Sequence, residues 1–254
     1  KDVFQAAPPM PVPYDFVNLA GDSKKMSASK GTGLDAKGVV EVLPPEVVRY
    51  FMLRYPPSKR LYFDPEKGVS QLIDEFAETL QKDMNSQLVK LSLRSFEPTV
   101  SQVPFSHLVA TYQSVLRSPA ATVEALTRTH EAAIQNTKVI KNELIYIDNW
   151  LDKWAPAELK FDLRRNIDSN DFTGGQKELL AALAAKIEQA PADADGEWFH
   201  KAIYDLKESK NLKPQQVFEP LYMALIGKKS GPRAGWFLSI LPRDWLIKRL
   251  RLEA

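Results

Sequence analysis

The segment Val69-Ser-Gln-Leu-Ile-Asp-Glu-Phe-Ala-Glu-Thr-Leu-Gln-Lys-Asp-Met-Asn-Ser-Gln-Leu-Val-Lys-Leu91 has the apolar pattern of a long helix. Its apolar residues recur at spacings of three and four, which places them on one face of a helix. They are Leu72, Ile73, Phe76, Leu80, Met84, Leu88 and Leu91. Only 11 of the 254 residues are Gly, and good helix formers fill long stretches. We therefore expect a mainly α-helical chain.

Further helices are predicted on both sides of this segment. Pro44-Pro45-Glu46 opens one helix and Pro56-Pro57 closes it, while Pro, Asp and Gly signals bound the later ones. The predicted spans are 44–55, 105–116, 119–154, 176–189, 195–209 and 214–226, followed by a short helix that begins at Pro242. Residues 1–42 are rich in Pro, Gly and Ser, so we expect extended loop there without regular helix, and a short strand within 14–19.

The composition excludes several classes of site and location. The absence of Cys excludes disulfides and thiolate zinc sites, and His107, His130 and His200 are too far apart to form a local metal motif. We expect no bound metal. No stretch approaches the length of a membrane span, and the first 13 residues lack both an initiator Met and the apolar core of a signal peptide. A cytoplasmic protein, with no membrane partner, is expected.

The net charge of +2 is unevenly distributed. Residues 201–254 hold 11 Lys and Arg against 5 Asp and Glu, whereas residues 71–200 hold 13 against 19. The basic end also carries many aromatic residues, and cations together with aromatic faces are what single-stranded nucleic acid requires. Packing of these aromatic side chains in the core explains their helical spacing equally well.

The string Gly21-Asp-Ser-Lys-Lys-Met-Ser-Ala-Ser-Lys-Gly-Thr-Gly33 has the chemistry of a phosphate-binding loop. Its glycines permit close backbone approach, while its lysines and serines offer charge and hydroxyls to a polyphosphate. It lacks the P-loop pattern. From chemistry alone, an anion-binding loop and a solvated basic loop are both open.

Lys25-Met-Ser-Ala-Ser-Lys-Gly31 resembles the Lys-Met-Ser-Lys-Ser signature loop of class I aminoacyl-tRNA synthetases. The flanking strings are similar to the class I lysyl-tRNA synthetases in particular. They are Pro13-Tyr-Asp-Phe16, Leu19-Ala-Gly21, Leu43-Pro-Pro-Glu-Val-Val-Arg-Tyr-Phe-Met-Leu-Arg54 and Phe63-Asp64. The tail, from Val217-Phe-Glu-Pro-Leu-Tyr-Met-Ala-Leu-Ile-Gly227 through Gly231-Pro232 to Lys248-Arg-Leu250, is similar to the end of the anticodon-binding region of that family.

This resemblance implies roles for individual residues. Lys25 and Lys30 would be catalytic, stabilising the charge that moves onto pyrophosphate when the lysine carboxylate attacks ATP. Met26, Ser27, Ser29 and Gly31 would bind ATP, which acts with Mg²⁺ in the whole enzyme; for Met26 and the serines, a loop-stabilising role without ligand contact is the alternative. Candidate tRNA contacts are Arg164, Arg165, Lys228, Lys229, Arg233 and Trp236. A solvated loop is the alternative for Arg164-Arg165, and a core position for Trp236.

The implied architecture has three parts. Residues 1–66 would be the signature-loop and connector segment, a short loop and strand remnant of the class I catalytic domain. Residues 67–194 would be the helical bundle of the anticodon-binding region, and 195–254 its C-terminal helical subdomain, together forming a helical cage.

Two features depart from the family pattern. Ala28 stands where many class I enzymes have a second Lys, although Lys30 lies two residues on. None of the histidines belongs to a His-x-Gly-His string, so the nucleotide-binding half is missing. We therefore expect the C-terminal half of a lysine–tRNA ligase, monomeric, inactive alone, and partnered by tRNA-Lys and the missing half. The alternatives are a non-catalytic tRNA-binding or interaction module with a relic loop, and the corresponding region of a glutamyl-tRNA synthetase.

Overall fold

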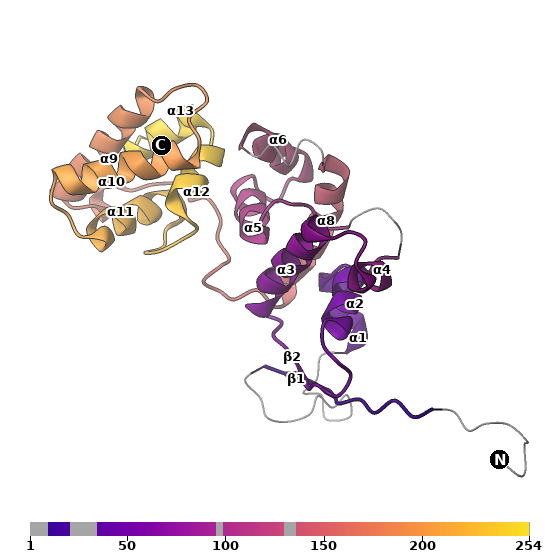
Figure 1. Ribbon diagram of the computed structural model, residues 1–254. Helices are drawn as coiled ribbons and strands as arrows, with labels where there is room; N and C mark the ends of the chain where they lie inside the picture. The colour runs from indigo at the N-terminus through magenta and orange to yellow at the C-terminus, as the bar shows by residue number, and fades with distance from the viewer. Residues whose placement is uncertain (1–9, 21–34, 95–98, 130–135, 254) are drawn as a thin grey trace, which may run out of the picture. The chain divides into compact units, whose positions relative to one another are not determined.

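The computed structural model describes residues 10–20, 35–94, 99–129 and 136–253 (Figure 1). The chain forms two compact units, residues 1–99 and residues 100–254. Helices dominate both units, so the expectation of a mainly α-helical chain is confirmed.

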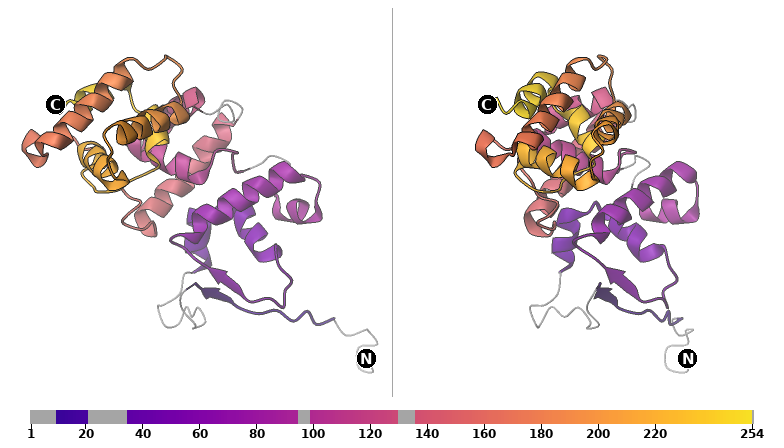
Figure 2. Two further views of the ribbon diagram at one scale, coloured as in Figure 1. Left: turned by 60° about the vertical axis from the view of Figure 1, so that its left-hand side comes forward. Right: turned by 90° about the vertical axis from the view of Figure 1, so that its left-hand side faces the viewer.

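Two short strands pair in the first unit (Figure 2). Strand β1 (Val17–Leu19) lies parallel to β2 (Leu61–Phe63), with Val17 opposite Leu61. The Ala20 N–H donates to the Phe63 carbonyl at 2.9 Å and extends the pairing by one residue. The strand expected within 14–19 is thereby confirmed, whereas β2 is too short for its alternation to stand out.

The expectation that residues 1–42 contain no regular helix is wrong, because α1 (Ala36–Val42) forms there. Asp35 caps it, accepting the Gly38 N–H at 2.7 Å, and Val42 is buried at its end. Cap and burial together outweigh the cost of an internal glycine. The next helix, α2 (Pro45–Leu53), begins with Pro in its first turn as predicted.

The long helix predicted over 69–91 is two helices, α3 (Gly68–Lys82) and α4 (Gln87–Ser92). Asp83 accepts the Asn85 N–H at 2.9 Å, and Ser86 caps α4 by accepting the Val89 N–H at 3.3 Å. Such local side-chain acceptors compete with helical hydrogen bonds and end the helix. The apolar spacing continues across the break and conceals it.

The second unit begins with α5 (Phe105–Ser114), α6 (Pro119–Thr129) and α8 (Thr137–Lys153). The helix predicted over 119–154 is covered by α6 and α8, while residues 130–135 lie outside the described ranges. The Phe105 and Trp150 rings meet edge to face, with centroids 5.3 Å apart, and join α5 to α8.

The remaining helices enclose a second core of Leu, Ile, Ala and Phe side chains. Asp195 caps α10 by accepting the Trp198 N–H at 2.9 Å, and Gly227 ends α11 in the left-handed region at φ 68°, both as predicted. Figure 1 shows these helices in orange and yellow around the C-terminus. They are η2 (Ser169–Asp171), α9 (Gly174–Glu188), α10 (Gly196–Ser209), α11 (Pro214–Ile226), α12 (Ala234–Ile240) and α13 (Arg243–Leu250).

Helices α10 and α12 approach each other closely at a pair of glycines. A Cβ placed on Gly235 would lie 2.2 Å from the Gly196 carbonyl oxygen and 3.0 Å from the His200 nitrogen. No side chain fits at that distance, so the crossing requires Gly at position 235.

Candidate nucleic-acid interface

The predicted signature loop, Lys25 to Gly31, lies outside the described residues, and the structure describes the segments on either side of it. Strand β1 ends at Leu19, and α1 begins at Ala36 behind its Asp35 cap. Before the strand, the Asp15 N–H donates to the Pro57 carbonyl at 3.1 Å, and the Asp15 carboxylate pairs with Arg60 at 3.1 Å. The chain is therefore anchored on both sides of the loop.

Two side chains from the string Pro44–Tyr50, those of Arg49 and Tyr50, connect α2 to the neighbouring helices of the first unit. Arg49 on α2 donates from Nη2 to the Leu91 carbonyl at 2.5 Å and from Nε to the Ser92 carbonyl at 3.2 Å, which satisfies the C-terminal end of α4. The Tyr50 hydroxyl donates to Glu75 on α3 at 2.9 Å. Burial is the main cause that raises the pKa of Tyr50, so this hydroxyl stays protonated.

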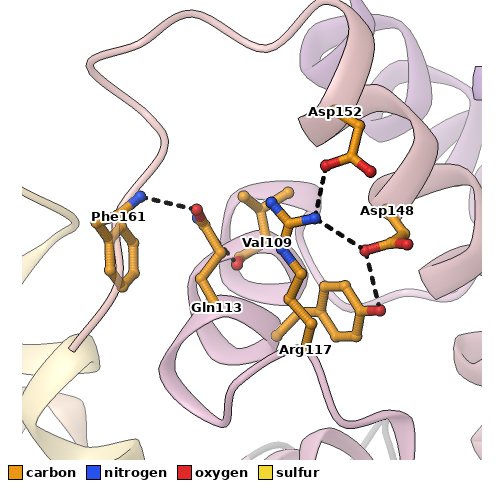
Figure 3. Close-up of polar contacts among 7 residues, drawn as sticks. Val109, Gln113, Arg117, Asp148, Asp152 and Phe161 are labelled. Atoms are coloured by element: carbon orange, nitrogen blue, oxygen red, sulfur yellow. Dashed lines mark hydrogen bonds and ion pairs between the residues drawn. The ribbon is translucent and has the colours of Figure 1, made fainter.

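In the second unit, Gln113 attaches the chain after α8 to α5 (Figure 3). Its amide nitrogen donates to the Leu159 carbonyl at 3.0 Å, and its oxygen accepts the Phe161 N–H at 2.9 Å. The side chain is only 2% exposed, so these bonds satisfy backbone groups away from water.

Arg117 joins the end of α5 to α8. Its Nη1 lies 2.6 Å from Asp152 and 3.3 Å from Asp148, and Asp148 also accepts the Tyr112 hydroxyl at 3.2 Å (Figure 3). Burial and the charge of Asp148 raise the pKa of Tyr112 to about 12. The sequence offered no local signal for this cluster, because Tyr112 and Arg117 lie more than 30 positions before the two aspartates that they contact.

Arg164 and Arg165, the first pair of predicted tRNA contacts, lie in the turn between α8 and α9. Arg164 pairs with Asp171 at 2.5 Å and donates to the Met223 carbonyl at 3.3 Å, whereas the Arg165 side chain is exposed. Within this pair, the exposed guanidinium is the group available to an RNA phosphate.

Arg249 on α13 holds the turn that contains Arg164 and Arg165. It was not among the predicted site residues. It is 2% exposed, and its Nη2 donates to the carbonyls of Arg164 and Arg165 at 2.6 and 3.0 Å. Burial, together with the charge of Arg164, lowers the pKa of Arg249. The guanidinium lies over the Trp245 ring, 5.1 Å from its centroid. Arg249 thus fixes the backbone that presents Arg165.

Lys228, Lys229 and Arg233 occupy the loop between α11 and α12. Lys228 donates to the carbonyls of Ala157 and Lys160, while the exposed Lys229 pairs with Glu219 at 3.1 Å. The exposed Arg233 precedes the first residue of α12. Lys228 therefore fastens the loop, and Lys229 and Arg233 carry its surface charge.

Trp236 is held by side chains on neighbouring helices. Its ring stacks on His107 of α5, with centroids 4.3 Å apart and an interplanar angle of 27°. A Cβ placed on Gly196 of α10 would lie 3.2 Å from the indole. The half-buried ring thus contributes to packing between α5, α10 and α12.

A row of aromatic rings with one lysine beside it, Lys207, runs along α10 and α11 and is called the aromatic surface. The rings of His200 and Tyr204 lie 4.3 Å apart, Phe218 lies 6.1 Å from Tyr204, and Lys207 Nζ is 4.8 Å from the Tyr204 centroid. All four side chains are half-buried. Partly exposed rings beside a cation suit base stacking combined with phosphate attraction.

The described residues contain no group of three or more His, Cys, Asp or Glu side chains that could hold a metal ion. Across the same residues, no helix has both the length and the apolar character that crossing a membrane requires.

Two family models match the sequence. Residues 1–98 match tRNA synthetases class I (K), and residues 156–253 match an anticodon binding domain. The lysine–tRNA ligase of Archaeoglobus fulgidus is 33% identical over 252 residues, covering 99% of this chain and 50% of that protein. The lysine–tRNA ligase of Methanosarcina barkeri is 29% identical over 275 residues, covering 98% of this chain and 51% of that protein. The lysine–tRNA ligase of Picrophilus torridus is 29% identical over 259 residues, covering 98% of this chain and 50% of that protein.

The chain spans about half the length of the curated relatives that it matches. The matches follow the order that the sequence strings indicated, with the synthetase segment first and the anticodon-binding domain last. Residues 1–98 therefore belong to the class I (K) tRNA synthetases, residues 156–253 belong to an anticodon-binding domain family, and the chain as a whole is similar to lysine–tRNA ligases.

Proposed function

We propose that this chain supplies a lysine–tRNA ligase with its signature loop and its recognition of the tRNA anticodon. The ligase would activate lysine with ATP and transfer it to tRNA-Lys. The observation that carries the proposal is the agreement between family matches and compact units. The synthetase match at 1–98 falls in the unit 1–99, and the anticodon-binding match at 156–253 falls in the unit 100–254.

In the first unit, Lys25 and Lys30 would neutralise the charge that develops on pyrophosphate when the lysine carboxylate attacks the α-phosphate of ATP. This is electrostatic stabilisation and requires no proton transfer from the lysines. Met26, Ser27, Ser29 and Gly31 would contact ATP, which acts with Mg²⁺. The proposal is supported by the resemblance of the loop and by the anchored segments before and after it.

In the second unit, exposed cations and half-buried aromatic rings would contact an unpaired RNA loop. Arg165, Lys229 and Arg233 would meet phosphates, and the aromatic surface on α10 and α11 would stack bases. Arg164, Lys228 and Trp236 would position these groups through the contacts described above. We expect the whole enzyme to act as a monomer in the cytoplasm.

The catalytic part of the proposal is tested by Lys25→Ala in the complete enzyme, with Lys37→Ala as the control. Lys37 lies exposed in the first turn of α1, so its replacement makes the same change in charge. Lys25→Ala is expected to slow lysine-dependent ATP–pyrophosphate exchange by about 100-fold and to leave the Kd for tRNA-Lys unchanged, because the lost interaction is made in the transition state. Lys37→Ala should change neither quantity.

Equal losses of exchange and of tRNA binding in Lys25→Ala would show that the loop has a positional role. Exchange at the normal rate would show that the loop is a relic. Either result contradicts the catalytic assignment.

A further inference from the structure

A pocket of about 400 Å³ opens between the first turns of α9 and α11. The apolar wall of the pocket consists of the buried Leu179 and Pro220 and the half-buried Leu212. Glutamine side chains from both helices supply the polar lining. A volume of this size with apolar walls and a few polar groups is typical of a small-molecule or single-base site.

The amides of two lining glutamines are already oriented. Gln176 accepts the Thr173 N–H at 2.9 Å, and Gln216 accepts the Lys213 N–H at 2.8 Å. In each glutamine the side-chain oxygen faces the backbone N–H that it accepts. The NH₂ group of the same amide therefore points away from that N–H. In the described part of the chain neither NH₂ donates a hydrogen bond, and both side chains line the pocket. Two residues of the lining therefore carry an NH₂ group that can donate to a ligand.

A third glutamine supplies an acceptor. Gln215 donates from its amide nitrogen to Glu219 at 3.3 Å, which leaves its oxygen as an acceptor. The Glu219 carboxylate is paired with Lys229 at 3.1 Å, so its charge is offset where it meets the pocket. The lining thus offers two donor groups and one acceptor, with little net charge.

Uracil presents the complementary set of groups, because its two carbonyl oxygens accept and its N3–H donates. Cytosine replaces one carbonyl with an NH₂ donor and the N3–H with an acceptor, so it would oppose both features. Phosphates on either side of the base would meet Lys177 and Lys213, which adjoin the pocket in the first turn of α9 and at the cap of α11. The N-terminal ends of the two helices favour anions further.

We propose that this pocket receives one unpaired uracil of the tRNA anticodon loop and that Gln176 and Gln216 read its carbonyl oxygens. The inference rests on the proposed function, since it names a base-reading site within the anticodon-binding domain. It adds two residues that belong to no sequence motif, because they come from two helices and lie about 40 positions apart.

Two isosteric variants test the reading of the base. Gln176→Glu and Gln216→Glu keep the oxygen that caps each helix, as glutamate does in a capping box, and remove the NH₂ donor. Gln189→Glu makes the same change in charge at the other end of α9, about 20 Å away. The 254-residue chain is titrated by fluorescence anisotropy with the tRNA-Lys anticodon stem-loop and with copies in which single loop uridines are replaced by cytidine.

For the wild-type chain and Gln189→Glu we expect one uridine whose replacement weakens binding by about tenfold. In Gln176→Glu and Gln216→Glu that ratio should fall towards one. Because the readout is a ratio between two RNAs of equal charge, a general electrostatic loss does not produce it.

A second pair of variants tests occupancy of the pocket independently. A Cβ on Gly174 or on Gly175 meets no atom within 4 Å, so both positions accept a side chain, but only Gly175 lines the pocket. Gly175→Leu should abolish the preference for uridine, whereas Gly174→Leu should retain it.

The proposal is overturned if the wild-type chain binds the stem-loop without preference for any uridine. It is equally overturned if the preference persists in both glutamate variants and in Gly175→Leu. In those cases binding to the stem-loop would still support the proposed function. A wild-type chain that binds no stem-loop would overturn both.

Discussion

Tyr112 shows how one buried hydroxyl makes the second unit sensitive to alkali. The residue is 5% exposed, and its hydroxyl donates to Asp148 at 3.2 Å. Burial and the neighbouring carboxylate raise its pKa from 10.0 to about 12. Because the raised pKa favours the protonated form in the folded state, the stabilisation is complete below pH 10 and is lost as the pH rises towards 12.

Tyr112→Phe is therefore expected to destabilise the chain more at about pH 8 than at about pH 11. At about pH 8 the variant should lose about 1 kcal/mol of unfolding free energy, because one buried hydrogen bond is removed. Between about pH 8 and pH 11 the wild-type chain should lose more stability than the variant, so the gap should narrow. Urea unfolding at both values measures this. Parallel pH profiles for the two proteins would contradict the assignment.

Single residues could be predicted where their role is local. Asp195 as a cap, Gly227 past the end of a helix and Pro242 before α13 all follow from short-range backbone chemistry. Arg249 could not be assigned its role, because the carbonyls that it binds lie 84 and 85 positions away. The candidate tRNA contacts are five cations and one aromatic ring, and only the fold separates the exposed Arg165 from Arg164, which is paired with Asp171.

At the level of elements, apolar spacing located most helices and misjudged their interruptions. The pattern from Val69 to Leu91 is continuous, yet the acceptors at Asp83 and Ser86 divide it. The helix α1 could not be predicted, because seven residues that include Gly38 are too few to show a helical apolar pattern. Periodicity reports which face is buried, whereas local hydrogen bonds decide where a helix ends.

The crossing of α10 and α12 gives a prediction at the same level. Gly235→Ala should lower the free energy of unfolding by about 3 kcal/mol. The added methyl group would lie 2.2 Å from the Gly196 carbonyl oxygen, and the backbone of α10 or α12 would have to shift to relieve the clash. Gly174→Ala is the matched control, since a Cβ there meets nothing within 4 Å, and it should leave stability unchanged within about 0.5 kcal/mol. Denaturant unfolding of both variants checks the difference. Equal midpoints would mean that the helices do not cross this closely.

At the scale of the whole molecule, the two units carry different parts of the proposed function. The first unit contains the segments that flank the predicted signature loop, and the second carries the aromatic surface with Lys207 on α10 and α11. The order of the two parts could be predicted from the strings at each end of the chain. The pocket between α9 and α11 could not, because the glutamines that line it carry no motif and meet only through the fold.

The most direct test of the account is the equilibrium binding of the 254-residue chain to tRNA-Lys and to tRNA-Glu, measured by filter binding at about 50 and 200 mM salt. Phosphate contacts alone weaken steeply with salt and do not distinguish the two RNAs. We predict that tRNA-Lys is preferred by about tenfold or more at both salt concentrations, because base contacts persist when phosphate contacts are screened. Equal affinities for the two tRNAs, falling together as salt increases, would contradict anticodon recognition by this chain.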